Sequence, residues 1–202
     1  DQNDDQYWRL IYWLALRRQA VLTGTWRASQ ALALVGPAAC GKSFVQAQVI
    51  TKLLGGRIAK PYRYMSGATE FNGDLFAAEH LCISDEAPGR DIHSRRSLGS
   101  HIKSMLFDID QSCHPKNRQA ITLRPIWAMS ISLNDEPENL QVLPPLDPSL
   151  MDKLIILRCV RQTLPWPGPE IEVLKDILET ELAAFAHYLD GLTVPEHLVE
   201  PR

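Results

Sequence analysis

Gly36-Pro37-Ala38-Ala39-Cys40-Gly41-Lys42-Ser43 matches the pattern G-x-x-x-x-G-K-[ST] at every fixed position. The run before it, Ala31-Leu32-Ala33-Leu34-Val35, is short and apolar and predicts a strand that is buried on both faces. The residues after it, Ser43 to Leu54, predict a helix that Gly55-Gly56 closes. The pattern therefore stands in the strand, turn and helix context that it requires.

This stretch predicts a phosphate-binding loop. Its glycines let the backbone curl so that N–H groups face the phosphates, and the helix that begins near Lys42 adds the positive end of its dipole. We expect Lys42 to reach the β- and γ-phosphates of ATP and the Ser43 hydroxyl to ligate Mg²⁺. The alternative is a glycine turn with a solvated lysine. The residues expected to line the nucleotide are Gly36, Pro37, Ala38, Ala39, Cys40, Gly41, Lys42 and Ser43.

An acidic pair follows the next apolar run. Leu81-Cys82-Ile83 predicts a second strand, and Asp85 and Glu86 come directly after it. We expect Asp85 to be a Mg²⁺ partner, direct or through water, and Glu86 to be the base that polarises an attacking water. An acidic pair after a strand is more often a solvated turn, but its position one strand and one helix beyond the loop favours the catalytic interpretation.

Two further apolar runs complete a predicted sheet. Ile126 to Leu133 leads into Asn134, and Leu154 to Leu157 follows Lys153. Strands separated by helical stretches are typical of an α/β fold with a mostly parallel sheet, which binds ligands at the carboxyl ends of its strands. An Asn at a strand end can also simply start a turn.

The chain divides into three predicted parts. Residues 1–30 form an N-terminal helical segment, with a helix over residues 5–20; residues 31–160 form the core; residues 161–202 form a proline-rich linker and an amphipathic C-terminal helix. Within the core, Ile92, Leu98, Ile102, Met105, Leu106 and Ile109 indicate one apolar helix face.

Composition indicates a folded protein with no overall charge bias. The chain has 202 residues, 45% of them hydrophobic and 22% charged, and a formal net charge of −3. These values argue against disorder, and any nucleic acid would need a local basic patch. The cysteines have no C-x-x-C spacing, the first residues are acidic and polar, and no apolar run approaches membrane-spanning length. We therefore expect a cytoplasmic protein with free thiols, and the absence of a starting Met is typical of a fragment of a larger one.

Together these motifs resemble the superfamily 3 helicases, particularly the primase-helicases of phages, plasmids and large DNA viruses. Those proteins carry motifs A, B and C in the order found between Gly36 and Asn134. Asn134-Asp135-Glu136-Pro137 is similar to the N-x-x-P after their motif C, and 147–157 is similar to their next conserved region. The resemblance covers about residues 30 to 160 and implies an AAA+ type P-loop NTPase.

The resemblance also implies roles for further residues. Asn134 is expected to touch the γ-phosphate and to help orient the water. Where the family usually has an Arg that serves the neighbouring subunit's ATP site, this chain has Lys153, which cannot reproduce the planar guanidinium fork. Lys153 is the first candidate for this trans-acting cation and Arg158 the second; a solvated lysine at a strand edge is an equal alternative.

The family places a DNA-touching hairpin between motifs B and C. The polar stretch Gln111 to Thr122 predicts a loop or projecting hairpin, and within it Cys113 to Arg118 corresponds to the hairpin of the family. Lys116 and Arg118 stand two residues apart, so on an extended arm they share a face and can reach consecutive phosphates. A solvated charged loop is the alternative.

We therefore predict an ATP-hydrolysing motor domain that resembles superfamily 3 DNA helicases and translocates on or unwinds DNA in replication of a phage or mobile element. It would act as a homo-hexamer or other ring and would bind DNA, expected to be single-stranded, through the local basic loop. No membrane is expected as a partner. The alternatives are an AAA+ ATPase that remodels a protein partner, a nucleotide-dependent switch and, less well supported, a P-loop kinase.

Overall fold

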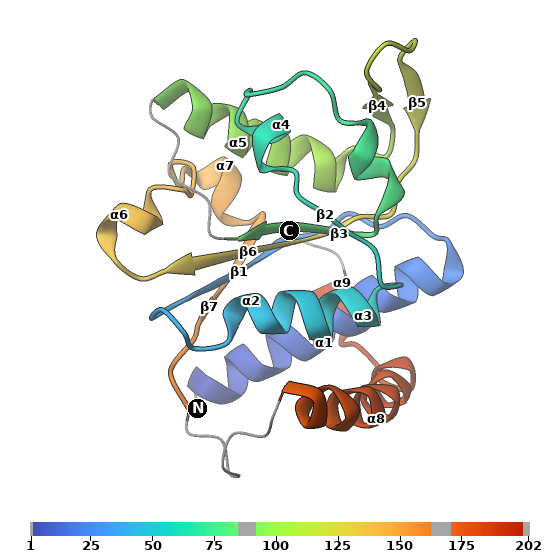
Figure 1. Ribbon diagram of the computed structural model, residues 1–202, viewed down its shortest axis with the longest axis vertical. Coiled ribbons are helices and arrows are strands. Elements are labelled where there is room, and N and C mark those ends of the chain that lie inside the picture. Colours follow the sequence, from blue (N-terminus) through green and yellow to red (C-terminus); the bar gives the residue numbers. More distant parts are fainter. Residues whose placement is uncertain (1, 85–91, 163–170, 200–202) are drawn as a thin grey trace.

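The computed structural model describes residues 2–84, 92–162 and 171–199. At its centre is a parallel sheet with the strand order β2-β3-β6-β1-β7 (Figure 1). The strands are β1 (Ala31–Gly36), β2 (Ile58–Ala59), β3 (His80–Ser84), β6 (Ala128–Asn134) and β7 (Leu154–Arg158). The predicted α/β fold with a mostly parallel sheet is confirmed.

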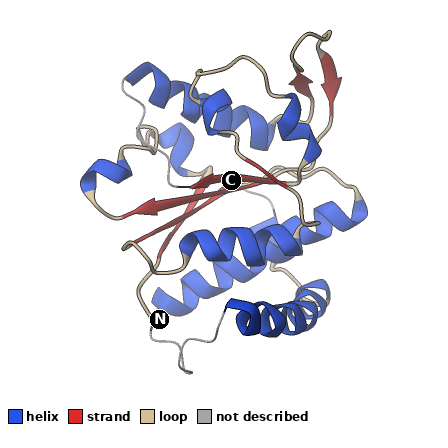
Figure 2. Ribbon diagram, in the orientation of Figure 1, coloured by secondary structure: helices blue, strands red, loops and turns tan. Residues whose placement is uncertain are grey.

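Helices cover both faces of this sheet, which forms the middle of three layers (Figure 2). Below it in Figure 1 lie α1 (Gln2–Thr23), α2 (Lys42–Phe44), α3 (Thr51–Leu53) and α8 (Ile171–Asp190). Above it lie α4 (Tyr62–Met65), α5 (Ile92–Phe107) and α7 (Pro148–Met151). Each face has its own apolar core, so the central strands are buried on both sides, as their uninterrupted apolar runs predict.

The register of the strands aligns the ends that carry the predicted site. Gly36 pairs with Asn134 across β1 and β6, and Val35 pairs with Arg158 across β1 and β7. Ser84, at the end of β3, pairs with Ser132 of β6. Because all these strands are parallel, their carboxyl ends lie along one edge of the sheet.

The helix after the loop, predicted as a regular helix over Ser43 to Leu54, contains a π-helical turn in its middle. α2 passes into a π-helical turn, Val45–Ile50, which passes into α3. Such turns are rare and are often found near functional sites. Gly55 and Gly56 follow with φ of 102° and 87°, so the predicted glycine closure of this helix is confirmed.

The predicted basic arm is a hairpin. β4 (Gln111–Cys113) and β5 (Ile121–Leu123) pair in antiparallel fashion and project beyond the sheet in Figure 1. The Asn72 side chain anchors β4 and the first residue after it, because Nδ2 donates to the Ser112 carbonyl at 2.8 Å and Oδ1 accepts the His114 N–H at 2.6 Å.

Some predictions of local structure were wrong. α5 ends at Phe107, which leaves Ile109 41% exposed, and Ile92 at its start is 42% exposed; the middle of the predicted face is buried. The sequence pattern also gave no sign of several short elements, since elements this short carry little periodicity. These are β2, α4, α6 (Pro137–Leu140), α7 and α9 (Glu196–Val199). No helix in the described part of the chain is both long and apolar enough to span a membrane.

Candidate nucleotide site

The loop between β1 and α2 has the backbone of a phosphate cradle. Ala39 and Gly41 both have positive φ, 59° and 91°, the left-handed conformation found in turns whose N–H groups form anion-binding hollows. Gly36 must lack a side chain, because a Cβ there would overlap the carbonyl of Cys159. The loop therefore packs directly on the end of β7.

Lys42 fills the centre of this loop. Its side chain is 8% exposed, and its Nζ donates to the carbonyls of Gly36 at 2.8 Å and Pro37 at 2.7 Å and to Asn134 Oδ1 at 3.1 Å. Among the described residues these acceptors are neutral, and no carboxylate pairs with the ammonium. A buried cation without a counter-charge is costly, so this position favours an anionic ligand.

Asn134 meets Lys42 because of the strand register, not because of nearness in sequence. The residues are 92 positions apart, and the pairing of β1 with β6 sets Asn134 beside the first glycine of the loop. The structure thus brings together two of the side chains that the sequence placed at strand ends.

Two other predicted site residues, Asp85 and Glu86, lie outside the described residues. The last described residue of β3, Ser84, pairs with Ser132, two positions before Asn134. β3 therefore ends on the same edge of the sheet as the loop. Ser43, the predicted Mg²⁺ ligand, is exposed in the first turn of the helix that follows the loop.

Sequence analysis did not identify a buried polar network that lies behind the loop. Gln46, in the π-helical turn, donates Nε2 to the Ile83 carbonyl at 3.3 Å and to Ser130 Oγ at 2.8 Å. His80 lies between Ser130 Oγ and Thr51 Oγ1, each at 2.7 Å from a ring nitrogen. The network therefore ties the helix after the loop to β3 and β6, the strands that lead to Asp85 and Asn134.

A neutral His80 satisfies both hydrogen bonds that its ring makes in this network. Thr51 Oγ1 gives its proton to the Gln46 carbonyl, so it must accept from His80 Nδ1; Ser130 then donates to Nε2. Desolvation by burial lowers the pKa of His80 to about 4, which agrees with this assignment.

The loop that follows β7 adds two groups to the site that sequence reasoning did not select. Arg161 donates Nε and Nη2 to the Ala38 carbonyl at 3.2 and 3.0 Å, although it is 123 residues away. Cys159 donates its backbone N–H to Val35, and burial, then the neighbouring Cys40, raises the pKa of its thiol. No local motif marks either residue, since only tertiary packing brings them to the loop.

Lys153 lies at the other end of β7 from the loop. β7 is five residues long, so roughly 16 Å separates this lysine from the nucleotide edge of its own chain. Its Nζ bonds Asp152 Oδ2 at 2.6 Å and lies 4.0 Å from the centre of the Phe107 ring. Arg158 is exposed at the loop end of the same strand. Their proposed action on a neighbouring subunit stays a prediction.

The predicted DNA contacts, Lys116 and Arg118, are exposed at the tip of the β4–β5 hairpin.

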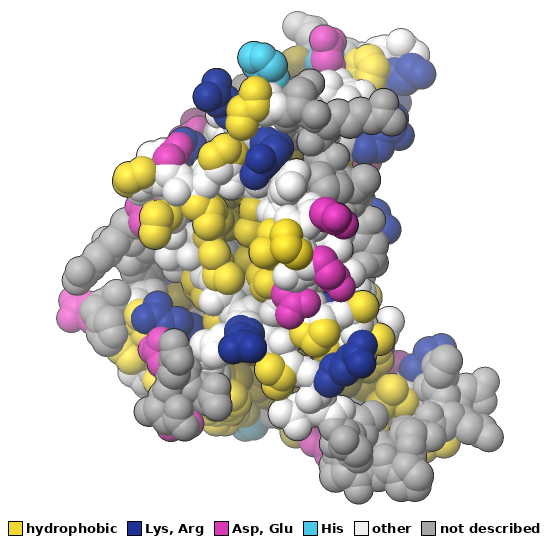
Figure 3. Space-filling view, turned by 90° about the vertical axis from the view of Figure 1, so that its left-hand side faces the viewer, with side chains coloured by type: hydrophobic (Ala, Val, Ile, Leu, Met, Phe, Trp, Pro, Cys, Tyr) yellow, Lys and Arg dark blue, Asp and Glu magenta, His cyan; other side chains and the backbone are white. Residues whose placement is uncertain are grey.

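Figure 3 views the molecule from the left of Figure 1, the side toward which β6 points. On this face hydrophobic side chains gather between Lys and Arg side chains above and below them.

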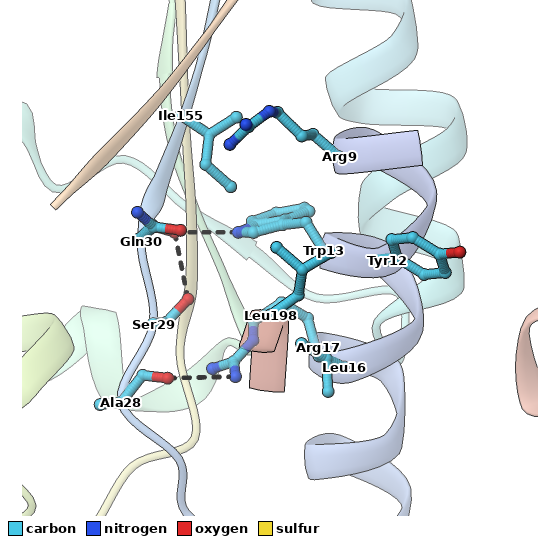
Figure 4. Close-up of a pocket in the computed structure, with 10 residues that line it drawn as sticks. All are labelled: Arg9, Tyr12, Trp13, Leu16, Arg17, Ala28, Ser29, Gln30, Ile155 and Leu198. Atoms are coloured by element: carbon cyan, nitrogen blue, oxygen red, sulfur yellow. Dashed lines mark hydrogen bonds between the residues drawn. The ribbon is translucent and has the colours of Figure 1, made fainter. Parts of the chain in front are cut away.

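A separate pocket of about 50 Å³ lies between α1 and residues 28–30 (Figure 4). Trp13 Nε1 donates there to the Gln30 carbonyl, and Arg17 donates to the carbonyls of Arg27 and Ala28. Burial, and then the charge of Arg27, lower the pKa of Arg17 to about 10. These bonds fix α1 to the segment before β1, and we assign the pocket a structural role.

Two solved structures of the NrS-1 C-terminal region are similar in fold to this chain. The apo structure of the NrS-1 C-terminal region (305–718) matches with a TM-score of 0.73 at 16% identity, over 98% of this chain and 45% of that chain. The A form of the same region matches with a TM-score of 0.68 at 17% identity, over 95% and 42%. The proteins share a fold. This chain spans less than half of the NrS-1 region.

No protein-family model and no curated protein sequence matches the chain. A structure of JCV helicase with a bound small molecule matches with a TM-score of 0.48 at 12% identity, over 96% of this chain and 56% of that chain, which is too distant to carry an argument. At such identities the likeness shows the fold alone, and function has to be argued from the site.

Proposed function

We propose that this chain is the ATP-hydrolysing domain of a DNA motor of the superfamily 3 helicase type. The observation that carries the proposal is the buried Lys42 ammonium, which lies 3.1 Å from Asn134 in a loop that offers it only neutral acceptors among the described residues. A triphosphate in the loop would supply negative charge to this ammonium.

The groups around the loop suit phosphoryl chemistry. The loop N–H groups and Lys42 would hold the β- and γ-phosphates, and Ser43 and Asp85 would hold Mg²⁺. Mg²⁺, when bound, neutralises charge on the phosphate oxygens. Its fit rests on the exposed Ser43 hydroxyl at the head of the helix.

The proposed reaction is attack of water on the γ-phosphorus. The new bond joins the water oxygen to phosphorus, the bond to the β–γ bridging oxygen breaks, and Glu86 receives the proton of the water. Asn134 would touch the γ-phosphate and help to orient this water. In such a site the protein contributes mainly position and charge stabilisation.

The β4–β5 hairpin is the proposed DNA contact. Lys116 and Arg118 lie exposed at its tip, and Asn72 fixes the hairpin to the domain at Ser112 and His114. This attachment would allow motion of the domain to be transmitted to the tip. In a ring, several copies of this weak contact would act together.

The first test is steady-state ATP hydrolysis by the longest available form of the protein, wild type beside Glu86→Gln, with and without single-stranded DNA. We expect turnover that DNA stimulates and that Glu86→Gln abolishes. Turnover that is indifferent to DNA would instead indicate an ATPase that remodels proteins. ATP binding without turnover would indicate a switch, and phosphate transfer to a metabolite would indicate a kinase.

The DNA contact has its own test. We expect the double variant Lys116→Ala/Arg118→Ala to bind single-stranded DNA more weakly and with a shallower salt dependence, by about 0.7 in log–log slope for each lost phosphate contact. The matched control is Lys60→Ala/Lys175→Ala, which removes the same charge from exposed positions elsewhere. Equal loss in both double variants would contradict a specific role for the hairpin.

A further inference from the structure

A second cavity opens directly beside the phosphate loop. Its volume is about 280 Å³, near the lower end of the range for small-molecule pockets, ~300 Å³. Gly41 and Lys42 form the part of its lining that it shares with the loop. A ligand whose phosphates occupy the loop therefore has this cavity as an adjoining space.

The walls of the cavity come from parts of the chain that are far apart in sequence. The start of α1 contributes Tyr7 and Leu10, the helix after the loop contributes Val45, and the end of β7 contributes Leu157. Most of this lining is apolar, and Tyr7, with 52% of its surface exposed, supplies an aromatic ring at the cavity. An apolar wall with one available ring suits a flat heteroaromatic group.

The start of α1 is held in place at this wall. Gln6 Oε1 accepts the backbone N–H of Arg158 at 2.7 Å, which joins the helix to the end of β7. The Tyr7 ring packs edge-on against Trp8, with ring centres 5.3 Å apart. These contacts present Tyr7 to the cavity on a supported element.

We propose that this cavity receives the nucleoside of the bound nucleotide, with Tyr7 stacking on the base and Leu10 and Val45 packing beneath it. The inference rests on the proposed function and extends the nucleotide site to α1, outside the core that contains the sequence motifs. The N-terminal helix is then part of the ligand-binding machinery and not only a support for the sheet.

The test compares two probes that share phosphates and differ in the base: ATP and inorganic triphosphate, each titrated with Mg²⁺ into the same full chain. We expect Tyr7→Ala to weaken ATP binding about tenfold and to leave triphosphate binding unchanged, because only the stacking contact is lost. Tyr7→Phe should retain ATP binding. Leu10→Trp, which fills the cavity, should also weaken ATP but not triphosphate.

The control is Tyr188→Ala, which removes a tyrosine of similar exposure, 42%, that does not line the cavity. Equal ATP affinity in wild type, Tyr7→Ala and Leu10→Trp would overturn this inference while leaving the proposed function intact. So would an equal loss of ATP and triphosphate in Tyr7→Ala, since that indicates damage to the loop. A wild-type chain that binds neither probe would overturn the proposed function itself.

Discussion

Lys42 and Asn134 form the contact on which the candidate site depends. The Asn134 amide oxygen lies 3.1 Å from the ammonium, and both side chains are at least partly shielded from water. An amide there leaves the positive charge of the lysine available to a ligand. A carboxylate in the same place would neutralise it.

We therefore expect Asn134→Asp to weaken binding of a Mg²⁺-triphosphate by at least about tenfold, because the new carboxylate pairs with Lys42 and repels the ligand. Asn134→Ala, which adds no charge, should bind nearly as well as wild type but should hydrolyse ATP about a hundredfold more slowly. Isothermal titration calorimetry and steady-state kinetics measure the two effects. Asn139→Ala, which alters an amide bonded to Glu136, is the control. Equal binding by Asn134→Asp and Asn134→Ala would contradict this view of Lys42.

At the scale of elements, the helix after the loop is joined to the sheet by hydrogen bonds as well as by apolar packing. The π-helical turn Val45–Ile50 turns Gln46 toward β3 and β6, where it is fully buried. Gln46 Oε1 has no hydrogen-bond partner in the described part of the chain.

The neutral His80 in this network predicts a pH dependence of stability. The folded pKa, about 4, is below the ordinary value of 6.5, so the unfolded chain binds more protons between these values. Stability from this group is therefore complete above pH 6.5 and falls by about 3 kcal/mol as the pH drops to 4. Chemical denaturation across this pH range measures the effect.

His80→Gln is the variant that isolates this contribution, since it removes the titrating group. Its free energy of unfolding should change less between pH 6.5 and pH 4 than that of wild type. His93→Gln, at an exposed position of α5, should retain the wild-type pH dependence. If the His80 and His93 variants behave alike, protonation of His80 does not contribute.

At the scale of the whole molecule, Arg18 joins three helical segments on one face of the sheet. From α1 it donates Nε and Nη2 to the two Asp190 oxygens at the end of α8, at 2.7 and 3.0 Å, and Nη1 to the Leu53 carbonyl at 2.9 Å. This hydrogen bond to Arg18 also lowers the pKa of Asp190. The arginine thus links the first helix, the helix of the phosphate loop and the last long helix.

We expect Arg18→Ala to lower the free energy of unfolding by roughly 1 to 2 kcal/mol, because a bidentate ion pair and a carbonyl bond are lost together. Arg9→Ala removes the ion pair with Asp5 within α1. Because the two side chains are 50% and 63% exposed, this change should lower the free energy of unfolding by at most about 0.5 kcal/mol. Denaturant unfolding monitored by circular dichroism measures both. Equal effects would show that the link between helices adds nothing.

Much of the fold was predictable because its signals are local. Four apolar runs, those that end before Gly36, Asp85 and Asn134 and the one that follows Lys153, predict strands, and they correspond to β1, β3, β6 and β7. The amphipathic C-terminal helix predicted within residues 161–202 has strong periodicity, and it corresponds to α8, Ile171–Asp190. The short elements and the π-helical turn were not predictable, because neither leaves a pattern that differs from its surroundings.

By itself, the sequence determined the turn 36–43 between β1 and α2, because a glycine-rich turn between a buried strand and a helix is encoded in a few adjacent residues. Only the tertiary structure decided which distant groups meet that loop. The parallel register places Asn134 against Lys42, packing of β7 brings Arg161 to Ala38, and α1 sets Tyr7 at the adjoining cavity. These contacts depend on strand pairing and helix packing between residues far apart in the chain, and such packing has no local sequence signature.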